Sequence, residues 1–207
     1  MIRKRFKYFK TLHRCGLEST LRKISRNTPK YTNIIQIGAG EDGLCEKFNY
    51  HHKKTLDIDD SISPDYNLDI VNDDLSSCGK YDAVFCFEVL EHVSDLNLAL
   101  TNLKKLANMD TQFFFSVPFC FHIHADPFDY NRLTAEGINL LLLKNGFHNI
   151  NILYYGGYFS CIYDLIILTP MLKLLLFPLR FFSAIVYPLT IDSKNCPSGF
   201  VVSCRKN

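Results

Sequence analysis

The alternation of short apolar runs with helix-like segments is the feature that most constrains how this chain folds. Seven runs have the length and composition of strands, at residues 32–38, 53–59, 65–70, 80–89, 111–119, 148–155 and 199–205. Helix-like segments separate several of these runs, at residues 41–48, 94–108 and 134–147. Strands that alternate with helices usually form a parallel sheet with both faces covered. The sequence therefore predicts an α/β fold with a seven-stranded, mostly parallel sheet.

Two of the expected helices carry signals at their ends. Ser94 is a candidate N-cap for the segment 94–108, and Thr134 is a candidate N-cap for the segment 134–147. Gly146 lies where a glycine commonly ends a helix.

The composition is that of a globular chain with a sizeable core. Of the 207 residues, 47% are hydrophobic and eight are cysteines. No two cysteines form a C-x-x-C pair and several lie in apolar runs, so we expect reduced, buried thiols and no disulfide framework. The N-terminus lacks the apolar segment and cleavage site of a secretory signal, which together with the thiols predicts a cytoplasmic protein.

Charge is distributed unevenly along the chain. Residues 1–30 carry ten basic residues and one acid, a net charge of +9, whereas the remainder carries 13 basic residues and 20 acids, a net charge of −7. Apolar residues recur at roughly helical spacing among the basic ones, namely Ile2, Phe6, Phe9, Leu12 and Leu17. We therefore predict a basic amphipathic helical arm over residues 1–29, bent or broken near Gly16, ahead of a domain over residues 30–207.

An apolar insert, residues 156–197, precedes the last strand. Its centre, residues 161–189, is almost wholly apolar, but Asp164, Lys173, Arg180 and three prolines interrupt it. A membrane-spanning helix needs about 20 largely uncharged residues, so a simple span is disfavoured. Two short helices are expected instead, lying in a membrane interface or packed over a substrate cleft as a lid.

The segment IIQIGAGEDG, residues 34–43, indicates a nucleotide-binding loop. Gly38, Gly40 and Gly43 satisfy G-x-G-x-x-G after a strand, which allows a tight turn and close approach of a ligand to the backbone. Asp57 ends the second strand, and its separation in sequence from the glycine loop suits an acid that binds a ribose. From this loop alone NAD and S-adenosylmethionine fit equally well, and a glycine turn without a ligand is a third interpretation.

Two further motifs distinguish these alternatives. The fourth strand runs into F-C-F-E-V-L-E-H, residues 85–92, and H-A-D-P-F-D-Y-N-R-L-T follows at residues 124–134. With these motifs the chain resembles the class I S-adenosylmethionine-dependent methyltransferases, in particular the type 11-like group that includes bacterial enzymes associated with surface-glycan synthesis. The resemblance covers roughly residues 30–155 and the final strand. It implies a Rossmann-like, doubly wound sheet whose last strand is antiparallel.

The resemblance also implies S-adenosyl-L-methionine as cofactor and a set of residues that contact it. Asp57 would accept hydrogen bonds from the ribose hydroxyls, because a carboxylate offers two acceptor oxygens to a diol. Asp69 would bind the adenine amino group, and the glycines would lie near the methionine part. The whole implied set is Gln36, Gly38, Gly40, Asp57, Ile58, Asp69, Ile70 and Glu88.

Two positions depart from the family pattern. Gln36 stands where the family usually has an acid, and Asp42 stands where it has a further glycine. These departures keep open a methyltransferase-like scaffold without activity. An NAD(P)-dependent oxidoreductase is a second alternative, which accounts for the glycine loop and Asp57 but not for Asp69 and E-V-L-E-H.

The segment after the fifth strand offers candidate catalytic residues. Methyl transfer depends mainly on proximity and orientation, and a hydroxyl acceptor also needs a base. His124 is the first candidate for that base, and Asp129 would orient it or act itself. Tyr130 and Arg132 would bind acceptor oxygens or a phosphate. The alternative is that Asp129 and Arg132 only hold a rigid loop.

The sequence predicts no metal, because His122 and His124 have no clearly placed third ligand. Glu91 and His92 are expected to be structural, capping a helix or pairing with each other.

The expected partners follow from the two unusual segments. Residues 1–26 and 161–191 together suggest peripheral contact with the inner membrane face, since each Lys or Arg near an anionic surface contributes roughly 1 kcal/mol. The acceptor would then be a small molecule, a glycan or a lipid-linked sugar. A homodimer interface is the alternative for the insert, and nucleic acid is not expected because the chain lacks a second basic stripe.

Overall fold

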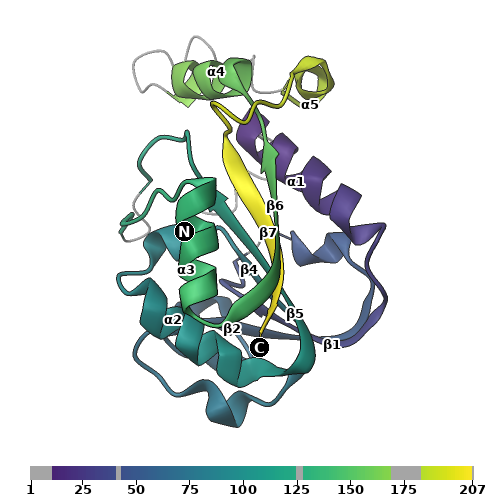
Figure 1. Ribbon diagram of the computed structural model, residues 1–207, viewed down its shortest axis with the longest axis vertical. Helices are drawn as coiled ribbons and strands as arrows, with labels where there is room; N and C mark the ends of the chain where they lie inside the picture. Colours follow the sequence, from purple (N-terminus) through teal and green to yellow (C-terminus); the bar gives the residue numbers. More distant parts are fainter. Residues whose placement is uncertain (1–10, 41–42, 125–127, 169–182, 207) are drawn as a thin grey trace.

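The computed structural model describes residues 11–40, 43–124, 128–168 and 183–206. These residues form a seven-stranded sheet of order β3-β2-β1-β4-β5-β7-β6 (Figure 1). The strands are β1 (Tyr31–Ile37), β2 (Tyr50–Asp57), β3 (Tyr66–Asn67), β4 (Tyr81–Phe87), β5 (Ala107–Pro118), β6 (Phe147–Tyr155) and β7 (Gly199–Lys206). Neighbours among β1 to β5 pair in parallel, whereas β7 is antiparallel to both β5 and β6. The predicted fold, including the antiparallel last strand, is confirmed.

Helices cover both faces of the sheet. Helix α1 (Leu12–Ser25) lies on one face, and α2 (Leu96–Leu103) and α3 (Ala135–Lys144) lie on the other (Figure 1). Successive side chains of a strand point to opposite faces, so neighbouring residues of β4 enter different cores. Val84 belongs to the core under α2 and α3, and Phe85 belongs to the core under α1. This double burial explains why β4 reads as a continuous apolar run.

The expected helix boundaries agree with the structure only in part. The N-cap of α2 is Asp95, not Ser94, and its carboxylate accepts hydrogen bonds from the backbone N–H groups of Asn97 and Leu98 at 2.9 and 3.0 Å. Thr134 caps α3 as predicted, and its Oγ1 accepts a hydrogen bond from Gly137 N at 3.0 Å. The segment 41–48 contains only a single 3₁₀ turn, Cys45–Lys47, because β2 begins soon afterwards; residues 41 and 42 lie outside the described residues.

Helix α1 passes through Gly16 without the predicted break. A Cβ atom at Gly16 would lie 2.9 Å from the Tyr155 ring and 3.2 Å from the Tyr187 ring. The glycine therefore allows close packing of α1 on β6, and the helix is continuous through it. Residues 1–10, which carry much of the predicted basic arm, lie outside the described residues.

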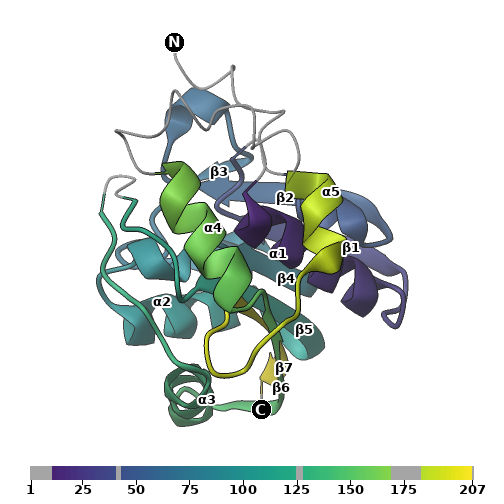
Figure 2. The ribbon, with the colours of Figure 1, turned by 90° about the horizontal axis from the view of Figure 1, so that it is seen from above.

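The apolar insert contributes two helices, α4 (Tyr158–Leu168) and α5 (Ser183–Val186), with residues 169–182 outside the described residues. Both pack against α1, as the view from above shows (Figure 2). The buried carboxylate of Asp164 in α4 accepts hydrogen bonds from Leu12 N at 2.8 Å and His13 N at 2.7 Å. These are N–H groups of the first turn of α1, which lack partners within the helix. No helix in the described parts of the chain is long and apolar enough to cross a membrane.

Candidate functional site

A cavity of about 390 Å³ opens where β1, β2, β3 and β4 end. Because the carboxyl ends of parallel strands meet at one edge of the sheet, residues from separate loops converge there. Five of the predicted cofactor-binding residues line it, namely Gly38, Asp57, Ile58, Asp69 and Ile70. Tyr130, predicted to bind the acceptor, also lines it.

Gly38 is required by geometry at the end of β1. Its φ angle is +70°, in the left-handed region, and a Cβ atom there would lie 2.2 Å from Cγ2 of Val89. The β1 turn and the loop after β4 can approach each other this closely only with glycine at this position. This contact forms one end of the cavity.

The two acids are oriented by short local hydrogen bonds. Oδ1 of Asp57 accepts a hydrogen bond from Asp59 N at 2.9 Å. Asp69 accepts one from Val71 N at 2.8 Å and another from the Asn72 side-chain amide at 2.7 Å. A carboxylate has about four acceptor positions, so each acid keeps capacity for a ligand.

The walls of the cavity are mainly apolar, and the sequence analysis did not identify them. They include Ile37, Leu56, Leu68, Val71, Val89 and Val93. Three of these directly precede a predicted ligand residue in the chain: Ile37 before Gly38, Leu56 before Asp57 and Leu68 before Asp69. An apolar residue directly before a predicted ligand residue is the sequence signal that could have identified these wall residues. Apolar walls with a few polar groups are typical of cofactor sites.

Three predicted cofactor residues lie outside the lining of this cavity. Gln36 is buried, and its Oε1 accepts a hydrogen bond from the Cys45 thiol at 2.7 Å. Gly40 has open space where a Cβ atom would lie, so sterics do not require glycine there. Glu88 is directed into a separate polar network on the α1 side.

Glu88 is partly buried, and both of its carboxylate oxygens are engaged in that network. Its Oε2 lies 2.9 Å from Nε2 of His13, and its Oε1 accepts a hydrogen bond from Ser116 Oγ at 2.7 Å. The Tyr155 hydroxyl lies 3.2 Å from the same His13 nitrogen. Burial opposes ionisation of Glu88, but His13 and the Ser116 hydrogen bond outweigh it and lower its pKa below the usual value.

The backbone of Glu88 has φ +54°, a left-handed conformation that is uncommon for a residue with a side chain. His13, its partner, was grouped with the basic arm in the sequence. Its spacing of four and eight residues from the buried Leu17 and Leu21 was the signal that it faces inward.

Glu91, three residues after Glu88 in the chain, differs from it in lacking short side-chain hydrogen bonds among the described residues and in the direction of its pKa shift. Its carboxyl group is buried, and within the described part of the chain neither oxygen has a hydrogen-bond partner. The Nε2 atoms of His92 and His124 lie 3.7 and 3.9 Å from Oε1 of Glu91. Burial, and then the charge of Glu88, raise the pKa of Glu91 to about 9. The group is therefore protonated at neutral pH, so the predicted Glu91–His92 pairing is not an ion pair there.

The candidate catalytic residues lie beside this carboxyl group. The His124 ring packs edge-on against His92, which lines the cavity, with ring centroids 5.1 Å apart. Burial lowers the pKa of His124, which favours a neutral imidazole. His124 N donates a hydrogen bond to Asp129 Oδ2 at 3.1 Å.

Asp129 is also bound by both terminal nitrogens of Arg132. Burial opposes ionisation of Asp129, but the Arg132 hydrogen bonds lower its pKa below the usual value. This arrangement matches the alternative in which Asp129 and Arg132 hold a rigid loop. Residues 125–127 of the same segment lie outside the described residues.

Among the described residues, two groups of side chains could hold a metal ion. They are Glu91, His92 and His124, and separately Cys120, Cys161 and Cys196; in each group the candidate ligand atoms all lie within 4.8 Å of one another. The first adjoins the cavity and the second does not line it. The expectation from the sequence that no metal is bound, which concerned His122 and His124, is not tested by the structure.

Comparison with known proteins gives a family and a fold. A family described as a methyltransferase domain matches residues 2–150. No curated protein sequence matches the chain significantly. Among solved structures, a SAM-dependent methyltransferase from Archaeoglobus fulgidus is similar, with 13% identity, a TM-score of 0.58 and coverage of 92% of this chain and 93% of that one.

Two further similar structures contain S-adenosylhomocysteine. One is the N-methyltransferase NodS of Bradyrhizobium japonicum WM9, with 12% identity, a TM-score of 0.56 and coverage of 92% and 85% of the two chains. The other is an O-methyltransferase from a trans-AT PKS multienzyme of Brevibacillus brevis, with 13% identity, a TM-score of 0.59 and coverage of 91% and 71%. At these identities the similarity shows a shared fold.

Proposed function

The chain belongs to the methyltransferase-domain family and has the class I S-adenosylmethionine-dependent methyltransferase fold, and we propose that it methylates an oxygen of a small-molecule, glycan or lipid-linked acceptor. The observation that carries the proposal is the cavity in which Asp57 and Asp69 meet beside Gly38. Two structures with a similar fold contain S-adenosylhomocysteine, the product of S-adenosylmethionine, which supports S-adenosylmethionine as the cofactor.

The cofactor would lie along the ends of β1, β2 and β3. Asp57 would accept hydrogen bonds from the two ribose hydroxyls, and Asp69 would bind the adenine amino group. The exposed side chain of Ile58 and the buried side chain of Ile70 would contact the adenine ring. Gly38 would admit the methionine part close to the backbone.

The transfer step would be an in-line displacement at the methyl carbon. When bound, the cofactor would supply its sulfonium methyl group, whose carbon would exchange its bond to sulfur for a bond to the acceptor oxygen. His124, kept neutral by burial, would take the acceptor proton. Asp129, held by Arg132, would act as a positioning residue for His124.

Calorimetric titration with S-adenosylhomocysteine and, separately, with NAD tests the cofactor assignment. We expect S-adenosylhomocysteine to bind and NAD not to bind. Asp57→Ala should weaken binding by about 10- to 100-fold, because hydrogen bonds to a charged group are worth about 1.5–3 kcal/mol. Asp60→Ala is the matched control, an exposed acid near the same strand end that does not line the cavity.

The alternatives give different outcomes in the same titration. Binding of NAD would support the oxidoreductase, which accounts for the glycine loop and Asp57 but gives no role to Asp69. Absence of binding by either compound would support a scaffold without activity. Unchanged affinity in Asp57→Ala would reject the ribose role of that residue.

A second part of the proposal concerns peripheral membrane contact through residues 1–26 and 161–191. Helix α4 exposes Ile162, Leu165 and Ile166, which are 57%, 46% and 46% exposed. The last turn of α1 and its C-cap add Arg22, Lys23 and Arg26 at the surface. Basic and apolar side chains together favour an anionic membrane surface.

Flotation with anionic vesicles tests this contact, with zwitterionic vesicles as control. The protein should float with the anionic vesicles, and the double variant Ile162→Ser, Ile166→Ser should reduce the bound fraction. Sedimentation equilibrium addresses the alternative: a dimer that the same variant dissociates, without flotation, would assign the exposed face to a homodimer.

A further inference from the structure

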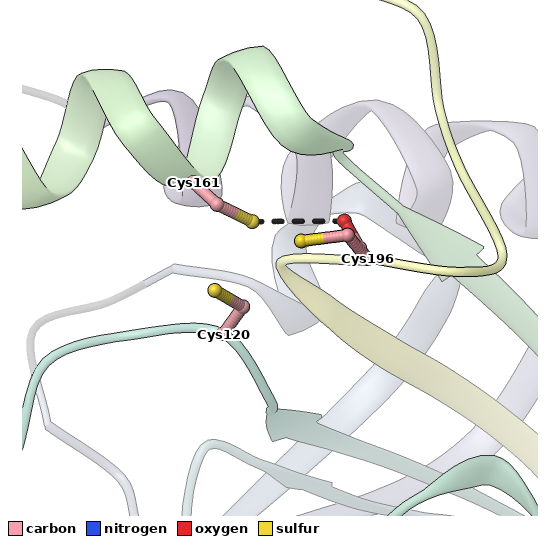
Figure 3. Close-up of side chains that lie close together, drawn as sticks. All are labelled: Cys120, Cys161 and Cys196. Carbon is pink, nitrogen blue, oxygen red and sulfur yellow. Dashed lines mark hydrogen bonds between the residues drawn. The ribbon is translucent and has the colours of Figure 1, made fainter.

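Three cysteines far apart in the sequence meet above the end of the sheet. Cys120 follows β5, Cys161 lies in α4, and Cys196 lies in the segment that leads into β7. Figure 3 shows the three side chains directed towards one another from these three elements. Their sulfur atoms all lie within 4.8 Å of one another. All three are free thiols.

The backbone that carries the three thiols is held in place by hydrogen bonds. Phe119 N donates to Ser198 O at 2.8 Å, and Cys120 N donates to Pro197 O at 3.4 Å. The start of α4 packs closely against the segment that leads into β7, because a Cβ atom at Gly157 would lie only 2.2 Å from Ile191 O. The thiols can therefore converge further by side-chain rotation alone.

The hydrogen bonds in this cluster are weak ones made by thiols. The Cys161 thiol lies 3.6 Å from both the Cys196 carbonyl oxygen and the Ser198 hydroxyl, and a thiol is a weak donor (Figure 3). A disulfide would engage only two of the three sulfur atoms and would give the third thiol no role. A metal ion uses all three.

The spacing suits a thiophilic ion. Zinc–sulfur bonds of about 2.3 Å in a tetrahedral site put sulfur atoms roughly 3.8 Å apart. Sulfur atoms within 4.8 Å of one another need to move by only about 1 Å to reach that arrangement. Cys161 is buried, whereas Cys120 and Cys196 are partly exposed, which leaves a path for the ion from solvent.

We propose that Cys120, Cys161 and Cys196 form a three-thiolate binding site for zinc, with a solvent molecule as fourth ligand. On binding, each S–H bond is replaced by a sulfur–zinc bond and the three protons pass to solvent. The site ties α4 to the end of β5, from which the segment carrying His124 departs, so zinc stabilises the rim of the cavity. The inference does not depend on the methyltransferase reaction.

Cobalt(II) titration of the full-length, reduced, metal-free protein tests the site. We expect one cobalt ion per chain, with the sulfur-to-metal charge-transfer absorption of thiolate ligands, and displacement of cobalt by zinc. Replacing each of Cys120, Cys161 and Cys196 by Ser should weaken binding by more than about 100-fold, the upper range for loss of an outer-sphere partner. Cys15→Ser, in α1 and outside the cluster, should leave binding unchanged.

A second measurement needs no substitution and so avoids variants that fail to fold. Zinc should protect Cys120 and Cys196 of the wild-type protein from alkylation, as read by mass spectrometry of the peptides. The proposal is overturned if the folded wild-type protein binds no cobalt and zinc gives no protection. It is equally overturned if the same spectra show a disulfide within the cluster in protein prepared without reductant and loaded with zinc.

Discussion

The two glutamates of the E-V-L-E-H segment, Glu88 partly buried and Glu91 fully buried, occupy opposite electrostatic environments. Beneath α1, Glu88 has His13 and Ser116 as hydrogen-bond partners at 2.9 and 2.7 Å, and its pKa is lowered. Beneath the segment after β5, Glu91 has two histidine nitrogens no closer than 3.7 Å, and its pKa is raised to about 9. Desolvation acts to raise the pKa of both carboxyl groups, so the opposite directions of the two shifts come from the partners.

One side of the segment, at Glu88, is anchored by hydrogen bonds, and the other side, at Glu91, can change its protonation state. A buried carboxylate with short hydrogen bonds is held charged and rigid, whereas one without them takes up a proton. The Glu88 side therefore acts as a fixed support beneath α1. The Glu91 side, next to the cavity, is expected to change its charge as the pH rises through about 9.

The largest expected effect lies on the Glu91 side and concerns activity. His124→Ala should lower the turnover number by about 10²- to 10⁴-fold, the usual contribution of a general base, while cofactor affinity stays the same. Single-turnover kinetics and S-adenosylhomocysteine titration measure the two quantities. His51→Ala, an exposed histidine of β2, should change neither. Turnover retained by His124→Ala would remove the base assignment.

The next effect lies on the Glu88 side and concerns stability. Glu88→Ala leaves the His13 imidazole and the Ser116 hydroxyl buried without their acceptor, and should lower the free energy of unfolding by about 3–5 kcal/mol. Urea denaturation measures this change. Glu46→Ala removes a half-exposed glutamate paired with Lys53 and should cost less than about 1 kcal/mol. Equal losses in the two variants would contradict the comparison.

The third effect is a pH dependence that only Glu91 should show. Because the pKa of Glu91 is raised to about 9, the native state keeps a proton that the unfolded chain has released, so stability falls as pH rises from 6 to 9. Glu91→Gln removes this component, which is on the order of a few kcal/mol. Urea denaturation across this range, with the exposed Glu136→Gln as control, measures it. Parallel profiles for wild type and Glu91→Gln would show that Glu91 is ionised in the native state.

The smallest effect tests how the insert supports the Glu88 side. Asp164→Asn removes the charge that caps α1 and should lower the free energy of unfolding by about 1–2 kcal/mol. Asp110→Asn, at an exposed position, should have no measurable effect. A change of less than a few tenths of a kcal/mol in Asp164→Asn would mean that α4 does not stabilise α1 through this contact.

The sequence by itself determined the α/β fold, because alternation of apolar strands and helices leaves few topologies. The resemblance of its motifs to the methyltransferases also indicated Gly38, Asp57 and Asp69 as cofactor residues. Their convergence follows from strand order, since parallel strands end at one edge and bring the residues that follow them together.

Only the tertiary structure decided which residues meet across long separations in the chain. His13 reaches Glu88, Asp164 reaches the start of α1, and three distant cysteines converge. No local spacing encodes these contacts, because they depend on how α1 and α4 pack on the sheet. The opposite pKa shifts of Glu88 and Glu91 have the same origin: the type of side chain is written in the sequence, but its burial and its partners are properties of the packed molecule.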